Sequence, residues 1–212
     1  MSLSHINRMR DFFMKIVQPI REKKQIDAMK AILSSGKMGP RNILLFSIGI
    51  NTAYRISDLR RLKLSDVLII SRGRVIAKER LEMKEQKTGK HNSIIISNKL
   101  RKQILEYAND SFPIHVANHD FDHFLFPSRK GNDQPLSRQA LWDVLSKAAK
   151  SMGMKNIGSH SMRKTFGYFL YKNGTHIEII QELLNHSSQR ETLRYIGITQ
   201  EDKDTAVMSL DL

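Results

Sequence analysis

The sequence predicts a mixed α+β domain that is mainly α-helical and contains a small antiparallel three-stranded sheet. Three observations support this fold class. Helix start and stop signals recur over most of the 212 residues. Runs rich in β-branched residues are confined to one stretch, from about residue 67 to 97. A hydrophobic content of 40% allows a chain of this length to bury a substantial core.

The first quarter of the chain is predicted to be helical after a basic arm. Residues 1 to about 24 carry basic clusters and are interpreted as an arm or linker. Apolar residues then recur at helical spacing over about 26–36. A second, more apolar helix is expected over about 40–50, because proline suits a first turn and Pro40 opens this segment. Ser57 is expected to cap a third helix.

The predicted sheet lies between about residues 67 and 97. Val75–Ala77 and Ile94–Ile96 are β-rich runs, separated by charged residues and by the turn Lys87–Lys90. Such runs around a turn that contains glycine are typical of an antiparallel hairpin. A helix near 98–108 is expected to follow.

Capping signals mark the remaining helices. The predicted starts and stops are a helix from Ser137 to Gly153, a helix from about Ser159 to Asn173, capping boxes at Thr175–Glu178 and Ser188–Glu191, and a last helix from Thr199 to about Leu210. We therefore expect one domain over residues 25–199, followed by a C-terminal helix within 200–212.

The charge balance indicates a polyanionic partner. Thirty-five Lys and Arg against 21 Asp and Glu leave a net charge of +14, and such an excess on a globular chain favours nucleic acid. The longest apolar stretch, Ile43–Ile50, is far shorter than the roughly 20 residues of a membrane span, so no membrane partner is expected. The absence of cysteine excludes disulfides, thiol nucleophiles and thiolate metal sites.

Three histidines, His115, His119 and His123, recur every fourth residue, a spacing that can place metal ligands on one helix face. The intervening Asn118 and Asp120 and the poor apolar periodicity argue against a helix there, and an HExxH pattern is absent. We therefore expect no metal and no cofactor.

Six polar residues stand in short sequence motifs that suit phosphate chemistry: Arg55, Lys87, His160, Arg163, His186 and Tyr195. Arg55 lies just before a predicted helix start, where free amides and the helix dipole favour an anion. His160 and Arg163 are three apart, so they share a helix face. Singly, each residue has an ordinary interpretation as a surface cation, a packing histidine or an interfacial aromatic. Lys84 and Lys90 flank Lys87, and spacing alone does not choose between them.

In this order, the motifs resemble the catalytic domain of the tyrosine recombinase, or phage integrase, family. The resemblance covers about residues 19–199, and its specificity lies in the joint spacing, with 23 residues from Arg163 to His186 and nine more to Tyr195. The frame Thr52–Leu59 around the first arginine and the lysine hairpin also match the family.

Two residues depart from the family pattern, because Ala53 and Asn185 stand where members commonly have glycine. Neither removes a reactive group. Members usually also carry an N-terminal helical DNA-binding domain, whereas only about 24 residues precede the predicted first helix here. The chain is therefore expected to be either a fragment or a short member of the family.

The resemblance implies a mechanism in which Tyr195 attacks a DNA phosphate and forms a 3′-phosphotyrosyl link. Arg55, Arg163 and His186 would hold the non-bridging oxygens, His160 would accept the tyrosine proton, and Lys87 would protonate the leaving 5′ oxygen. Asp58 would orient the cations. The expected DNA-binding residues are Lys84, Lys90, Arg129, Lys130 and Arg138.

The resemblance also implies a site-specific DNA recombinase or integrase of a bacterium or phage, cytoplasmic and associated with the nucleoid. Its partner would be double-stranded DNA, bound by a tetramer on two sites, with a monomer in free solution. The C-terminal helix would then dock on a neighbouring protomer. Two alternatives remain at this stage: a type IB topoisomerase-like nicking-closing enzyme, and a non-catalytic DNA-binding regulator on the same scaffold.

Overall fold

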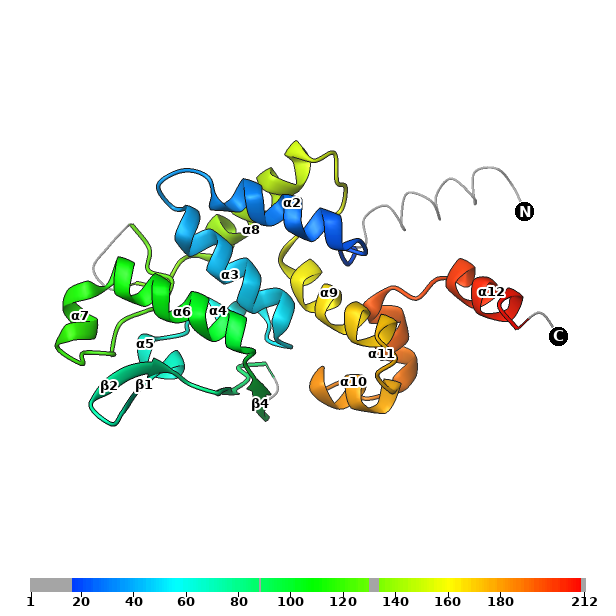
Figure 1. Cartoon of the computed structure of the whole chain (residues 1–212). Helices are drawn as coiled ribbons and strands as arrows, with labels where there is room; N and C mark the ends of the chain where they lie inside the picture. The colour runs from blue at the N-terminus through cyan, green and yellow to red at the C-terminus, as the bar shows by residue number, and fades with distance from the viewer. Residues whose placement is uncertain (1–16, 88, 130–133, 211–212) are drawn as a thin grey trace.

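The computed structural model describes residues 17–87, 89–129 and 134–210. Figure 1 shows a mainly helical molecule with two short hairpins along one side. The first part of the chain contains α2 (Lys23–Ser34), α3 (Gly39–Asn51), α4 (Ile56–Leu59), α5 (Leu64–Val67), β1 (Leu68–Ser71), β2 (Arg74–Ala77), β3 (Arg80–Lys84) and β4 (His91–Ile95). The second part contains α6 (Asn98–Ser111), α7 (Pro113–Ala117), α8 (Arg138–Ser151), α9 (Ser159–Lys172), α10 (Ile177–Leu183), α11 (Gln189–Ile196) and α12 (Gln200–Met208). In the described part of the chain, no helix combines the length and hydrophobicity that a membrane span requires.

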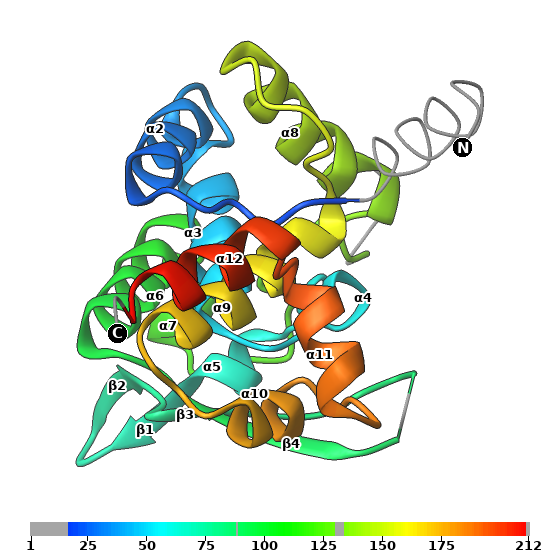
Figure 2. The ribbon, with the colours of Figure 1, turned by 90° about the vertical axis from the view of Figure 1, so that its right-hand side faces the viewer.

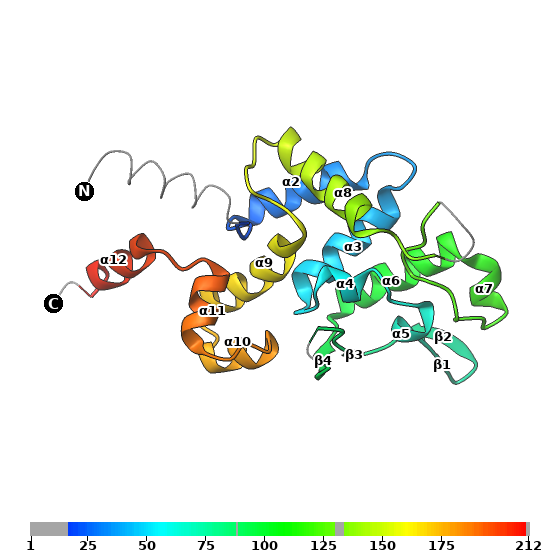
Figure 3. The same cartoon turned by 180° about the vertical axis from the view of Figure 1, so that it is seen from behind.

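Helix α3 is the central element of the core. It packs against α2, α6 and α9, while α8 lies along α2 (Figure 3). Gly49 permits the close approach of α9, because a Cβ at this position would lie 2.4 Å from the Sδ atom of Met162. Arg55 follows the end of α3 closely, and Arg163 follows Met162, so this packing brings the two arginines near each other.

The β-rich stretch forms two two-stranded antiparallel sheets, β1–β2 and β3–β4, so the prediction of one three-stranded sheet is wrong in its strand pairing. β2 and β3 are consecutive parts of one run that is interrupted at Lys78 and Glu79. The bonds from Lys78 N to Val67 O and from Ile96 N to Glu79 O, both 2.8 Å, continue each ladder up to the interruption. The chain from β2 through β3 therefore pairs first with β1 and then with β4. The mainly helical α+β class is confirmed.

Three predicted N-caps are confirmed. The side chains of Ser137, Ser188 and Thr199 accept hydrogen bonds from backbone N–H groups in the first turns of α8, α11 and α12. Each bond satisfies one of the amides that a helix start leaves without an intrahelical partner. The start of the helix that carries Tyr195 is thus fixed locally by sequence.

Two predicted N-caps are wrong. α4 begins at Ile56 with Arg55 as the N-cap residue, so Ser57 lies inside the helix. α10 begins at Ile177 after His176, with no side-chain cap, so Thr175 lies before the helix. In both cases an apolar residue of the new helix, Ile56 or Ile180, is buried, and tertiary packing places the helix start.

The chain before α2 packs against the C-terminal helices. Ile20 is buried, and its N–H donates to the hydroxyl of Thr165 in α9 at 2.8 Å. Arg21 donates to the carbonyl of Gly197 and pairs with Asp202 at 3.3 Å. Residues 1–16 of the predicted arm lie outside the described residues. Helix α12 has no buried residue and extends from the helical body (Figures 1 and 2).

Candidate active site

A surface cavity of about 460 Å³ lies where four segments meet. Its lining includes Arg55 before α4, Lys87 in the β3–β4 hairpin, Arg138 at the start of α8 and His160 at the start of α9. The fold therefore brings together on one surface three of the six predicted catalytic residues and one predicted DNA-binding residue. The cavity is cationic, which suits a phosphate.

Glu85 is the centre of a charge cluster beside this cavity. Its side chain is fully buried, and its carboxylate pairs with Arg55 and, at 3.4 Å, with Arg163. A carboxylate between two guanidinium groups reduces their mutual repulsion and fixes their orientation. The sequence analysis missed Glu85, since its signal, one acid within the basic segment 84–90, is equally typical of a solvated hairpin.

Arg163 is only 2% exposed and connects three parts of the fold. Besides pairing with Glu85, its guanidinium donates to the carbonyl oxygens of Ala53 and Leu184. These bonds use three of the five N–H groups of an arginine. Burial, and then the charge of Arg55, lower the pKa of Arg163, while Tyr195 and Glu85 raise it.

His186, two residues after Leu184, has a defined tautomer. Its Nδ1 lies 3.1 Å from the hydroxyl of Thr192, and that hydroxyl donates to the carbonyl of Ser188. Because the single hydroxyl proton is already used, Nδ1 must carry the proton of the imidazole, and Nε2 presents a lone pair. Burial lowers the pKa of His186 to about 4, so the ring is neutral at neutral pH.

Tyr195 lies on α11 with its ring against His186. The two rings meet edge to face, with centroids 4.8 Å apart. The Nζ atom of Lys164 lies 5.1 Å from the centroid of the Tyr195 ring. Burial raises the pKa of the phenol, while Arg163 and Arg55 partly lower it. The tyrosine is thus half-buried beside cations whose charges partly offset the desolvation that disfavours a phenolate.

Lys164 is a second residue that the sequence analysis missed. It is 8% exposed, although lysine is rarely buried, and desolvation lowers its pKa. Its position directly after Arg163 gave no signal, because neighbouring helix residues face different directions. The Lys164 ammonium is a further positive charge beside Tyr195.

His160 is exposed at the first turn of α9. Partial desolvation by surrounding protein atoms, followed by the charges of Lys164 and Arg163, lowers the pKa of this imidazole. A neutral imidazole can accept a proton, so desolvation and the neighbouring cations together favour the state of His160 that a general base requires.

Asp58 hydrogen-bonds to the backbone of the lysine hairpin. Its Oδ1 accepts a hydrogen bond of 3.3 Å from the N–H of Gln86, next to Lys87. Its Oδ2 is buried without a hydrogen-bond partner among the described residues, and burial raises the pKa of the carboxyl. Asp58 therefore positions the hairpin that carries Lys87, whereas Glu85 makes the direct contacts with the arginines.

The predicted DNA-binding residues lie at the surface. Lys84, Lys90, Arg129 and Arg138 are all exposed, and Arg138 lines the cavity. Lys130 lies outside the described residues. Exposed lysines and arginines around a cationic cavity are suited to contacts with a phosphate backbone.

Known proteins share this sequence pattern and this fold. The pattern of the "Phage integrase family" matches residues 20–202. The probable integrase/recombinase YoeC of Bacillus subtilis is 38% identical over 192 residues, which cover 91% of this chain and 94% of YoeC. Tyrosine recombinase XerA of Pyrococcus furiosus is 27% identical over 190 residues, 90% of this chain, but the matched part spans only 61% of XerA.

A solved structure agrees in fold. XerH site-specific recombinase, bound to a palindromic difH substrate, superposes with a TM-score of 0.70 at 19% identity, covering 93% of this chain and 54% of XerH. At this identity the likeness concerns the fold alone. Together with the family pattern, which covers most of the chain, it leads to one conclusion: this chain belongs to the phage integrase family of tyrosine recombinases.

Proposed function

We propose that this chain is a site-specific DNA recombinase that cleaves and rejoins double-stranded DNA through a 3′-phosphotyrosyl intermediate. The observation that carries the proposal is the position of Tyr195, half-buried beside His186 and next to the cluster of Arg163, Glu85 and Arg55. Family membership supports the same activity. XerH, which shares the fold, is a recombinase bound to a DNA substrate.

In the first step, the Tyr195 oxygen attacks the phosphorus, and the bond from phosphorus to the 5′ oxygen breaks. The phenol proton passes to His160, whose lowered pKa keeps it neutral and able to accept. Lys87 gives a proton to the departing 5′ oxygen. A 5′-hydroxyl of the second strand then attacks the phosphotyrosyl ester and releases Tyr195, so the number of phosphodiester bonds is conserved.

The arginines stabilise the charge that develops on the non-bridging oxygens. Glu85 and the backbone carbonyls hold Arg163 in place before DNA arrives, so little reorganisation is needed. His186 enters the reaction neutral, with a lone pair on its Nε2 atom. The negative phosphate favours protonation of this nitrogen, and His186 then donates a hydrogen bond to a non-bridging oxygen.

The working assembly is a tetramer of protomers on two DNA sites, as strand exchange between two duplexes requires. Binding is dominated by phosphate contacts and weakens steeply with salt, because neutralised phosphates release counterions. A surplus of 14 positive charges supports this dependence.

Covalent trapping tests the proposal. The chain is incubated with nicked duplexes that lose the free 5′ end after cleavage, and adducts that survive denaturant are quantified. We expect an adduct that maps to Tyr195 and is absent in Tyr195→Phe. Tyr171→Phe, which alters an exposed tyrosine on α9, is the matched control and should retain the adduct.

Three other outcomes would contradict this proposed function. An adduct that persists in Tyr195→Phe would overturn the proposed nucleophile. DNA binding without any adduct would favour a non-catalytic regulator. An adduct that rejoins only its original strand, and never an added second strand, would favour a topoisomerase-like enzyme.

A further inference from the structure

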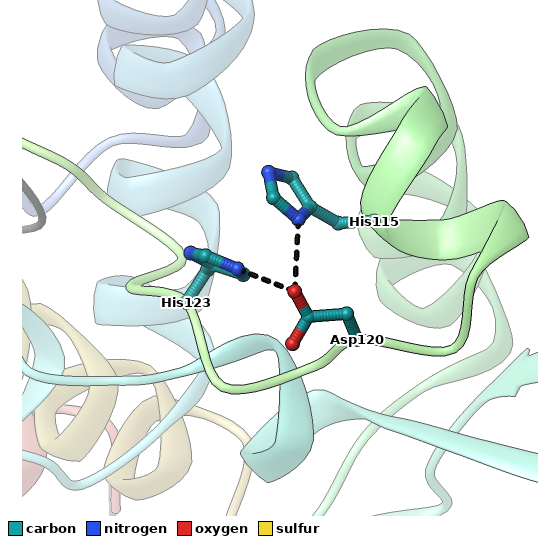
Figure 4. Close-up of side chains that lie close together, drawn as sticks. All are labelled: His115, Asp120 and His123. Carbon is teal, nitrogen blue, oxygen red and sulfur yellow. Dashed lines mark hydrogen bonds and ion pairs between the residues drawn. The ribbon is translucent and has the colours of Figure 1, made fainter.

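Two imidazoles and a carboxylate converge at the end of the molecule that lies farthest from α10 and α11 (Figures 1 and 3). The residues are His115 in α7, and Asp120 and His123 in the segment that follows (Figure 4). The Oδ2 atom of Asp120 lies 3.3 Å from Nδ1 of His115 and 2.9 Å from Nε2 of His123. One ligand atom from each residue falls within 4.8 Å of the other two.

A tight turn after α7 builds this cluster. His119 adopts a φ of +57°, a left-handed conformation that is uncommon for residues other than glycine. The turn reverses the direction of the chain, and the N–H of Asp120 donates to the carbonyl of His115 at 2.8 Å. The carboxylate is therefore directed at the histidine of the preceding helix by the backbone itself.

Backbone bonds also fix the other histidine. The carbonyl of His123 accepts from the N–H of Leu64 at 2.8 Å, and the carbonyl of Phe121 accepts from Ser65 at 3.0 Å. These bonds tie the segment to α5, so His123 belongs to an ordered surface and not to an isolated loop tip. The cluster thus bridges two parts of the fold, α7 and the segment held by α5.

The three donor atoms are also close enough together to share one cation. The two imidazole rings have centroids 3.8 Å apart, so two protonated rings would repel each other. A metal cation neutralises the carboxylate while both imidazoles stay neutral, and it uses all three donors at once.

We propose that His115, Asp120 and His123 bind a divalent first-row transition metal, with Zn²⁺ as the best match. Bonds of about 2.0–2.1 Å at tetrahedral angles separate neighbouring donor atoms by roughly 3.3 Å. The two distances from Asp120 Oδ2 to the imidazole nitrogens, 3.3 and 2.9 Å, are close to this value, and all three donor atoms lie within 4.8 Å of one another. Two imidazoles select against Ca²⁺ and Mg²⁺, which prefer oxygen. The three side chains are 29–51% exposed, so water can supply the fourth ligand.

The position of the site indicates that a bound metal would stabilise the fold. A bound metal would join α7 to the segment held by α5, and it would stabilise the folded state because the ligands are not assembled in the unfolded chain. The site shares no residue with the cavity that holds Arg55, Lys87 and His160. We therefore expect metal binding to raise thermal stability without supplying the cleavage chemistry.

The test uses the full chain, purified without a polyhistidine tag and treated with a chelator. Zn²⁺ is titrated by calorimetry, and Co²⁺ by visible absorption, in which tetrahedral coordination gives intense bands. We expect one equivalent to bind and the melting temperature to rise with free Zn²⁺. Asp120→Asn and His123→Ala should each weaken binding by at least about tenfold, since each removes a ligand.

Two matched variants serve as controls. His119→Asn removes the neighbouring imidazole but keeps a residue that tolerates positive φ, and His176→Ala removes an exposed histidine elsewhere. Both should bind Zn²⁺ as the parent chain does. Absence of binding at micromolar Zn²⁺, or equal binding by the parent, Asp120→Asn and His123→Ala chains, overturns the proposal. Circular dichroism of each variant excludes loss of folding as the cause of weaker binding.

Discussion

At the scale of single residues, Glu85 is the counter-charge of Arg55 and Arg163, two of the cations proposed to carry the chemistry. It is buried and pairs with two arginines, so its removal leaves both guanidinium groups without a counter-charge. We expect Glu85→Gln to lower the free energy of unfolding by about 3–5 kcal/mol, the usual cost of breaking a buried ion pair. Urea denaturation measures this, with Glu82→Gln, an exposed acid on the preceding strand β3, as the control. Equal, small losses in both variants would contradict the role of Glu85.

We expect Lys164 to act through its charge on Tyr195, the proposed nucleophile. An ammonium 5.1 Å from the Tyr195 ring centroid favours the phenolate over the phenol. We expect Lys164→Met to slow covalent adduct formation ~10-fold at neutral pH, which corresponds to one pKa unit, and the deficit to shrink as pH rises. Lys172→Met, on the exposed end of the same helix, should leave the rate unchanged. A deficit that is constant with pH would argue for a packing effect only.

His186 should make stability depend on pH. Its pKa is about 4 in the folded chain and about 6.5 when unfolded, so the unfolded state binds the proton more readily. The stabilisation is fully present above about pH 6.5 and is lost as pH falls toward 4, by about 1–2 kcal/mol between pH 7 and pH 5.

In His186→Asn, whose amide can still donate to Thr192, this pH-dependent loss should be smaller. Denaturation curves at pH 7 and pH 5 provide the measurement, and His176→Asn should behave like the parent chain. An unchanged pH dependence in His186→Asn would show that other groups cause the decline.

At the scale of elements, the cap of α11 connects local sequence to reactivity. The side chain of Ser188 accepts from the N–H of Glu191 and starts the helix that carries Tyr195. We expect Ser188→Ala to cost about 1 kcal/mol of stability and to slow adduct formation. Ser97→Ala removes the corresponding cap of α6 and should cost similar stability without slowing cleavage. Equal cleavage rates in the two variants would show that the cap of α11 does not affect the cleavage reaction.

The elements also show where local signals suffice. Capping at Ser137, Ser188 and Thr199 is confirmed, because a side-chain oxygen and the amides it satisfies lie within one turn. The starts of α4 and α10 and the pairing of the strands could not be predicted. Those features depend on which apolar residues the rest of the fold buries and on which strand lies alongside.

At the scale of the whole molecule, we expect α12 to be the element that takes part in assembly. It buries no residue against its own chain, and Val207, Met208 and Leu210 are exposed at its end. We expect deletion from Thr199 onward to weaken assembly on DNA while DNA contact is retained. Sedimentation of the protein with a DNA duplex distinguishes complexes of different stoichiometry. An unchanged stoichiometry after the deletion would rule out docking by this helix.

The sequence by itself determined the mainly helical class and most helix positions, because periodicity and capping are local properties of the chain. The six residues expected to carry the chemistry followed from the order and joint spacing of their motifs, which resemble the phage integrase family. The structure places Arg55, Lys87 and His160 around one cavity and sets Tyr195 against His186. Only the tertiary structure decided the roles of Glu85 and Lys164 and the meeting of His115 with Asp120 and His123. Burial, electrostatic pairing and convergence depend on distant segments that meet only after folding, so composition and spacing could not predict them.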